Sequence, residues 1–307
     1  MPSPRAGESR DDFLDRCIPE VVAEGRDPDQ AVAMCIAYYE GEKDKAFNLD
    51  KTGEVEYWKA MDRRRESFVS KYTRRFIKAI NDQVRIYEDA STVADFRREI
   101  DPQIMKDAYM DLYIEVGDRF ARTTWAGLKS MPFVETKQDP QWIEELRRYV
   151  DVDLAKRLAD LNKTTRRYID MAVAKALEEG LAIEEIRDRI IATSGQGSIN
   201  GMTPARAERI ARTEIVSASN AGSMFGAMST GLNFKTQWVS TKDDRTRDGD
   251  DEWNHEAMDG EVVNRGEPFV MYSQTGEINE MRYPGDPNGS AGNVINCRCT
   301  QIYITED

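Results

Sequence analysis

The chain has 307 residues, of which 40% are hydrophobic and 32% charged, and its formal net charge is −13 at neutral pH. This length suits two or three folding units of roughly 100–200 residues each. The net charge excludes a uniformly basic nucleic-acid binder, although it is compatible with a local basic face. We find no run of the ~18–20 apolar residues that a membrane span needs and no secretory signal, so we expect no membrane contact.

Four cysteines are too few for a disulfide scaffold in a chain of this length. Because no export signal is visible, we interpret them as reduced thiols or metal ligands. Cys17 and Cys35 lie among apolar residues in helix-like sequence. Free cysteines in such places are usually small buried side chains.

Helical periodicity dominates the first two thirds of the chain. Short helices are expected over 11–23 and 29–39, and a charged linker without periodicity follows from 41 to 53. From about 54 to 191, apolar residues recur at spacings of three, four and seven. The pattern predicts a long helix to about residue 87, and Asp-Pro pairs at 101–102 and 139–140 open further helices. The apolar residues from 154 to 177 either continue the helix opened at 139–140 or form a fourth. Gly180 ends that series, and a short helix over 183–191 completes an extended bundle.

Basic side chains concentrate on the predicted long helix. Residues 58–85 contain nine basic and three acidic side chains, whereas residues 235–307 contain seven basic and 15 acidic ones. We predict a basic docking face for acidic protein surface or DNA phosphates, with a solvated helix face as the alternative. Its residues are Arg63, Arg64, Arg74, Arg75 and Lys78.

The residue pattern of the sequence changes after a Gly/Ser/Asn-rich break at 195–201. Thr203 and Pro204 open a helix that Gly231 ends. Its stretch from 217 to 227 is rich in Gly, Ala and Ser, which permits close approach of another backbone. Short strands are expected over 234–240, 261–263, 268–272 and 293–304.

The predicted fold class is therefore α+β, with an extended, mostly helical N-terminal region and a small α+β C-terminal domain. We expect a short helical segment and linker over 1–50, a helical docking region over 51–200, and the α+β domain over 201–307.

Polar residues follow one another in a distinctive order through the C-terminal third. They are Arg212, Glu214, Asn220, Asp244, Arg245, Arg247, His255, Asp259, Gly260, Gly285, Asp286, Asn296, Cys297, Arg298 and Cys299. In order and spacing they resemble the Mu-F-like phage head morphogenesis family, the minor head proteins, over roughly residues 183–304. The seven residues between Arg247 and His255 are a longer gap than this resemblance leads us to expect.

The resemblance implies a virion assembly protein rather than an enzyme. Such a protein would be a low-copy component that binds the portal protein and the capsid or scaffold, and that supports head assembly, DNA packaging and ejection. It would be assembled in the host cytoplasm and would lie in the head interior, with DNA contact, if any, through the helical region. Related domains also occur beside toxin modules, and because the chain ends at Asp307 we do not expect a toxin.

A zinc site is one interpretation of the residues around His255, which is the only histidine. On a strand, Cys297 and Cys299 would point to the same face and could reach one zinc ion at ~2.3 Å. His255 would be the third ligand and Asp244 or Asp259 the fourth.

Two other interpretations use the same residues. In the first, Asp244, Arg245, Arg247 and His255 form a hydrogen-bonded network that fixes loops. In the second, the protein is a metal-dependent hydrolase or processing enzyme that uses His255 with Cys297 and Cys299.

The sequence also leads to expectations about one disulfide and one ion pair. A disulfide between Cys297 and Cys299 is not expected, because it would close a strained ring. We expect Arg212 and Glu214 to form an ion pair on their helix.

Overall fold

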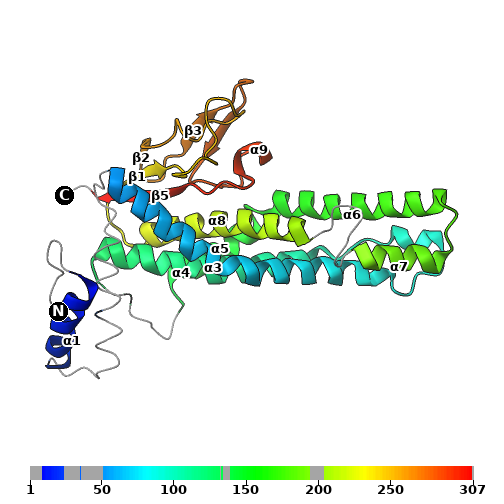
Figure 1. Ribbon diagram of the computed structural model, residues 1–307, viewed down its shortest axis with the longest axis horizontal. Coiled ribbons are helices and arrows are strands. Elements are labelled where there is room, and N and C mark those ends of the chain that lie inside the picture. Colours follow the sequence, from blue (N-terminus) through cyan, green and yellow to red (C-terminus); the bar gives the residue numbers. More distant parts are fainter. Residues whose placement is uncertain are drawn as a thin grey trace.

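The computed structural model describes residues 9–23, 35, 51–131, 133, 139–193 and 204–305. Helices make up most of this part of the chain, and a small strand-containing region follows them (Figure 1), which is the predicted α+β class. Within the described ranges, no helix combines the length and apolar character that crossing a membrane requires.

The helices begin and end close to the predicted positions. They are α1 (Arg10–Ala23), α3 (Lys51–Val84), α4 (Pro102–Lys129), α5 (Gln141–Asp151), α6 (Ala155–Glu178), α7 (Ile183–Thr193), α8 (Pro204–Ser229) and α9 (Ala291–Val294), with 3-10 helices η1 (Arg85–Tyr87) and η2 (Val93–Arg97). Asp101 caps α4 because its carboxylate accepts a hydrogen bond from the backbone N–H of Gln103. Apart from Cys35, the helix predicted over 29–39 lies outside the described residues, as do residues 41–50 of the predicted linker.

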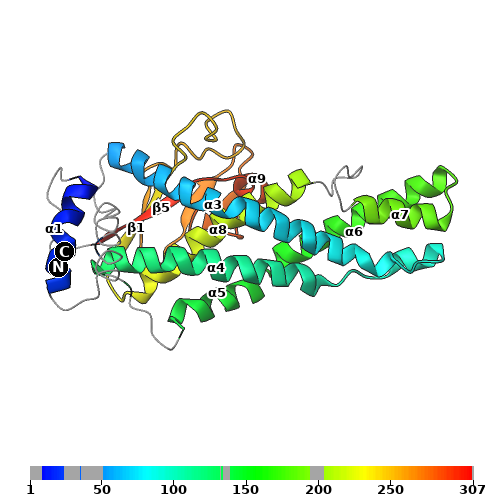
Figure 2. The same cartoon turned by 60° about the horizontal axis from the view of Figure 1, so that its bottom comes forward.

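The helices α3, α4, α5 and α8 form an elongated bundle, and α6 and α7 extend it toward one end (Figures 1 and 2). One hydrophobic core runs through it and includes stacked and tilted tyrosines on α4 and α5. The most extensive helix pair is α4 with α8. The small side chains predicted over 217–227 allow α8 to pack this closely on α4. A Cβ atom at Gly222 would lie 2.1 Å from the carbonyl oxygen of Gly117, so only glycine fits there. The division of the chain at residue 201 stays a prediction.

The strands lie over α8 at the end of the bundle opposite α7 (Figure 1). They are β1 (Phe234–Val239), β2 (Val262–Asn264), β3 (Phe269–Tyr272), β4 (Ile278–Met281) and β5 (Thr300–Thr305). An antiparallel sheet has the order β2-β1-β5, and β3 and β4 form a separate antiparallel pair. The strand predicted over 293–304 is wrong in its first half, because α9 ends at Val294 and Asn296 adopts a left-handed conformation with φ 58°. The extended ladder therefore starts only at Thr300.

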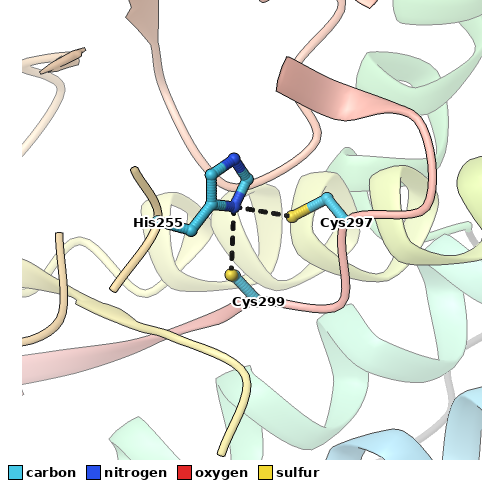
Figure 3. Close-up of side chains that lie close together, drawn as sticks. All are labelled: His255, Cys297 and Cys299. Atoms are coloured by element: carbon cyan, nitrogen blue, oxygen red, sulfur yellow. Dashed lines mark hydrogen bonds between the residues drawn. The ribbon is translucent and has the colours of Figure 1, made fainter. Parts of the chain in front are cut away.

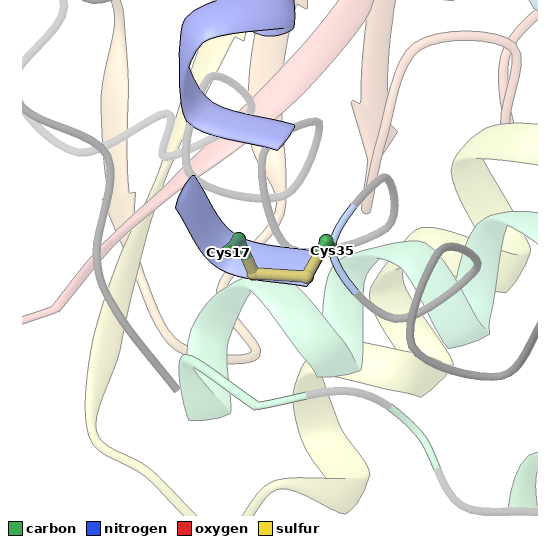
Figure 4. The surroundings of a disulfide bond; sticks show 2 residues. All are labelled: Cys17 and Cys35. Carbon is green, nitrogen blue, oxygen red and sulfur yellow. A yellow bond between two sulfur atoms is a disulfide. The ribbon is translucent and has the colours of Figure 1, made fainter. Parts of the chain in front are cut away.

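Cys17 and Cys35 form a disulfide in the structure, with their Cα atoms 6.0 Å apart (Figure 4). Both are buried beside Phe13 and Val21. Their predicted burial is confirmed, and their predicted reduced state is wrong. Sequence spacing alone did not reveal that the chain returns from Cys17 to place Cys35 within bonding distance.

Candidate metal centre

Three buried side chains from two distant segments meet beneath the small sheet (Figure 3). His255 lies in the loop between β1 and β2, whereas Cys297 and Cys299 lie between α9 and β5. The Nδ1 atom of His255 is 3.4 Å from the Sγ atom of Cys299 and 3.7 Å from that of Cys297. Each residue is at most 3% exposed. The predicted convergence of these three residues is thus present, although the two cysteines precede the strand rather than belonging to it.

The long loop before His255 closes on itself, so the extra residues do not displace the histidine. The backbone N–H groups of His255 and Glu256 both donate to the carbonyl oxygen of Arg247. Ser240, at the end of β1, donates its hydroxyl hydrogen to the carbonyl of His255. These bonds hold the histidine at the sheet while residues 248–252 remain exposed.

A chain of amide hydrogen bonds determines which ring nitrogen of His255 carries the proton. The backbone N–H of Ser290 donates to Oδ1 of Asn279, so that oxygen is an acceptor. It also faces the side-chain amide nitrogen of Asn293 at 3.0 Å, which leaves Oδ1 of Asn293 to face His255 Nε2 at 2.8 Å. The histidine must therefore donate from Nε2. Its Nδ1 lone pair is left free and points at the two sulfur atoms.

The two thiols share a proton unequally. The hydrogen bond to Cys299, together with burial, raises the pKa of Cys297 well above its usual range. Burial alone would raise the pKa of Cys299, but the hydrogen bond from the Cys297 thiol outweighs it and holds that pKa well below its usual range. The pair therefore favours one thiolate, on Cys299, hydrogen-bonded to one thiol.

Apolar side chains enclose the cluster on the side of the sheet. The ring of Trp238 meets His255 edge-on with centroids 5.9 Å apart, and it packs on Phe269. Trp253 and Val294 belong to the same buried group as the two cysteines. Such surroundings exclude water and strengthen electrostatic interactions inside them.

A pocket of about 610 Å³ opens on the other side of the cluster. His255 and Cys297 line it together with several arginines, among them Arg245 and Arg247. Arg247 is anchored by the carbonyl oxygens of Asn293 and Ile295, so it also ties the loop to α9.

Neither aspartate predicted as a fourth ligand belongs to the cluster. Asp244 is exposed, and Asp259 accepts hydrogen bonds from the backbone of Ser240 and from Lys242. The predicted network of Asp244, Arg245, Arg247 and His255 does not form as a unit, because Arg245 pairs with Asp243 while Arg247 lies 3.5 Å from His255 Nε2 and binds backbone carbonyls. Asp243 binds both Arg298 and Arg245, and the hydrogen bond from Arg298 holds the pKa of Asp243 well below its usual range. Asp243 and Asp244 are neighbours in the loop, but only Asp243 points toward the arginines. Spacing in the sequence does not show which of two neighbouring side chains points inward.

The expected ion pair between Arg212 and Glu214 is wrong, because residues two apart lie on different sides of a helix. Arg212 forms a bidentate ion pair with Glu66 of α3. Glu214 is buried, pairs with Arg157 at 3.2 Å and accepts a hydrogen bond from Tyr113. These motif residues therefore connect α8 to three other helices.

Arg65 is a central residue that the sequence analysis did not single out. It is buried and donates to Ser219 and Asn220 on α8 and to Thr300 on β5, at 2.7–3.1 Å. Asn220 in turn donates to the carbonyl oxygen of Cys299. One signal could have found Arg65: it lies within the apolar stripe of α3, in the series Met61, Arg65, Phe68 and Tyr72.

The remaining motif residues shape turns. Gly260 and Gly285 have φ values of 87° and 85°, which glycine adopts without strain. Asp286 is fully buried and accepts hydrogen bonds from the backbone and side chain of Arg282. The N–H of Asn296 donates to Thr213 on α8, which holds the turn before Cys297 against the bundle.

The five residues of the predicted basic docking face divide into two groups. Arg63, Arg74 and Lys78 are exposed, whereas Arg64 and Arg75 are half-buried. Arg75 pairs with Asp111, and Lys78 pairs with Asp82. Much of the positive charge on this helix is thus balanced locally.

Fold and cluster together define an α+β protein whose C-terminal third is organised around a buried histidine and two cysteines. Residues 167–302 match the family described as Phage Mu protein F like protein. The resemblance seen in the sequence is confirmed, and the match begins earlier than expected, within α6.

One curated relative is the NAD(+)--arginine ADP-ribosyltransferase EFV of Enterococcus faecalis, which is 28% identical over 156 residues. The match covers 50% of this chain but only 28% of that relative. No solved structure matches.

Proposed function

We propose that this protein is a bacteriophage minor head protein. It is a low-copy component that binds the portal protein and the procapsid interior, and that supports head assembly, DNA packaging and ejection. The observation that carries the proposal is the family match over residues 167–302. This range contains all of α8, whose residues Arg212, Glu214 and Asn220 bind α3, α6 and the segment before β5.

The exposed basic residues of α3 supply the portal contact in this proposal. Arg63, Arg74 and Lys78 are separated by 11 and four positions, close to whole numbers of helical turns, so they share one side of α3. The C-terminal part from residue 235 carries 15 acidic and seven basic residues, which disfavours DNA as its ligand. The docking surface therefore belongs to the helical region, with an acidic protein surface as its partner.

We expect the full-length protein to co-purify with the portal protein of the phage or prophage that encodes it. Changing Arg63, Arg74 and Lys78 together to glutamine should weaken this association by about tenfold or more, because each removed charge contributes to complementarity and to the rate of association. Quantitative pull-down at two salt concentrations measures the effect.

A matched control removes the same charge elsewhere. Lys163, Arg167 and Lys175 are exposed on α6, and their joint replacement by glutamine should leave portal binding unchanged. Equal binding by both triple variants would refute the α3 docking surface. A wild-type protein that bound DNA but not portal would refute the proposed partner.

A second candidate function is a metal-dependent hydrolase or processing enzyme, favoured by the pocket that His255 and Cys297 line. Three protein ligands beside an open pocket are typical of catalytic zinc. Rates of peptide and phosphodiester hydrolysis that are equal for the wild type and His255→Ala would exclude this candidate. The match to the ADP-ribosyltransferase covers 28% of that protein, and we propose no transferase activity for this chain.

A further inference from the structure

We propose that His255, Cys297 and Cys299 bind one zinc ion through Nδ1 and the two Sγ atoms, with the fourth coordination position facing the pocket. No other group of three or more potential metal ligands converges in this way within the described residues.

The spacing of the three ligand atoms fits a tetrahedral zinc ion. With Zn–N bonds of about 2.05 Å and Zn–S bonds of about 2.3 Å, tetrahedral angles place nitrogen and sulfur about 3.6 Å apart. The two observed separations from Nδ1, 3.4 and 3.7 Å, lie on either side of this value. All three ligand atoms lie within 4.8 Å of one another, so small shifts of the side chains suffice to admit an ion.

The protonation of the cluster also suits a metal. Asn293 holds the histidine in the form that leaves Nδ1 unprotonated, which is the form that binds zinc. Zinc binds cysteine as the thiolate, so binding releases the protons that the two thiol groups carry. Zinc with two thiolates and a neutral imidazole carries no net charge, which suits a largely apolar enclosure.

The pocket indicates where the fourth ligand comes from. His255 and Cys297 both line it, whereas Asp244 and Asp259 are engaged elsewhere or exposed. A water molecule or a small anion can reach this position, and Arg245 and Arg247 also face the pocket. The site would in addition tie the loop after β1 to the segment before β5.

The test uses full-length protein purified without a polyhistidine tag, since added histidines bind zinc. We expect about one zinc ion per chain by elemental analysis. His255→Ala and the double variant Cys297→Ser/Cys299→Ser should lose it. The double variant Cys17→Ser/Cys35→Ser is the matched control for removal of two cysteines and should retain it.

Cobalt substitution in the wild type tests the site independently of how the variants fold. Two thiolate ligands should give thiolate-to-cobalt charge-transfer absorption and the intense visible bands of tetrahedral Co²⁺. Adding azide should shift these bands if the fourth position is open to the pocket.

Three outcomes would overturn the proposal. The first is a wild-type protein without metal that takes up neither Zn²⁺ nor Co²⁺. The second is full zinc content in Cys297→Ser/Cys299→Ser. The third is a cobalt spectrum that azide leaves unchanged, which would show a closed fourth position.

Discussion

Replacing Gly222 with alanine is expected to destabilise the protein by about 3 kcal/mol or more, because the added methyl group has no room. Its Cβ atom would lie 2.1 Å from the carbonyl oxygen and 2.6 Å from the Cα atom of Gly117. Both are backbone atoms of α4, so the conflict cannot be relieved by a side-chain rotation. One turn later, Gly226 meets Ala121 with the same tightness, at 2.4 Å from its carbonyl oxygen. Relief therefore requires α4 and α8 to move apart along their whole contact.

Urea unfolding followed by circular dichroism measures this effect as a lower midpoint. Gly127 of α4 provides the matched control, because nothing lies within 4 Å of a Cβ atom built there. Gly127→Ala should be neutral or stabilising by up to about 1 kcal/mol, as expected when alanine replaces glycine in an open helical position. If both variants unfolded at the wild-type midpoint, α4 and α8 could not be in backbone contact.

Replacing Arg65 with methionine is expected to destabilise the protein by about 3–5 kcal/mol. Methionine keeps much of the side-chain volume but removes every donor. The acceptors on Asn220 and Thr300 and the carbonyl oxygens of Arg298 and Cys299 would lose this partner. They lie where α3, α8 and β5 meet, so the loss falls on the junction between bundle and sheet.

Differential scanning calorimetry of full-length protein tests this expectation. Arg63, two positions earlier on α3, is exposed, and Arg63→Met should change stability by no more than about 0.5 kcal/mol. Similar losses from both substitutions would mean that a general effect of charge, rather than the buried hydrogen bonds, explains the result.

Local sequence signals predicted most of the helical architecture. Apolar spacing located α3, α4, α5 and α6, and the proline after Asp101 marked the start of α4. These signals succeed because helix formation depends on residues within a turn or two of one another. The short strands were harder: β4 was missed and the start of β5 was wrong, because residue type alone does not reveal a turn such as the one at Asn296.

The candidate site, like the fold, could be predicted only in part from the sequence. Residue types alone selected His255, Cys297 and Cys299, since few other residues in the chain could form a soft-metal site. The sequence could not select the partners of the charged residues. It favoured Asp244 where the structure uses Asp243, and it joined Arg212 to Glu214 where each binds another helix.

By itself, the sequence determined the helical bundle, the α+β class, the resemblance of its C-terminal part to the Mu-F-like family and the three residue types of the cluster. Only the tertiary structure decided that His255 reaches the two sulfur atoms, that Asn293 sets its tautomer and that Arg65 joins bundle to sheet. The physical reason is distance along the chain. Periodicity and capping act between near neighbours, whereas these contacts join residues from 38 to 235 positions apart, and only the packed fold brings them together.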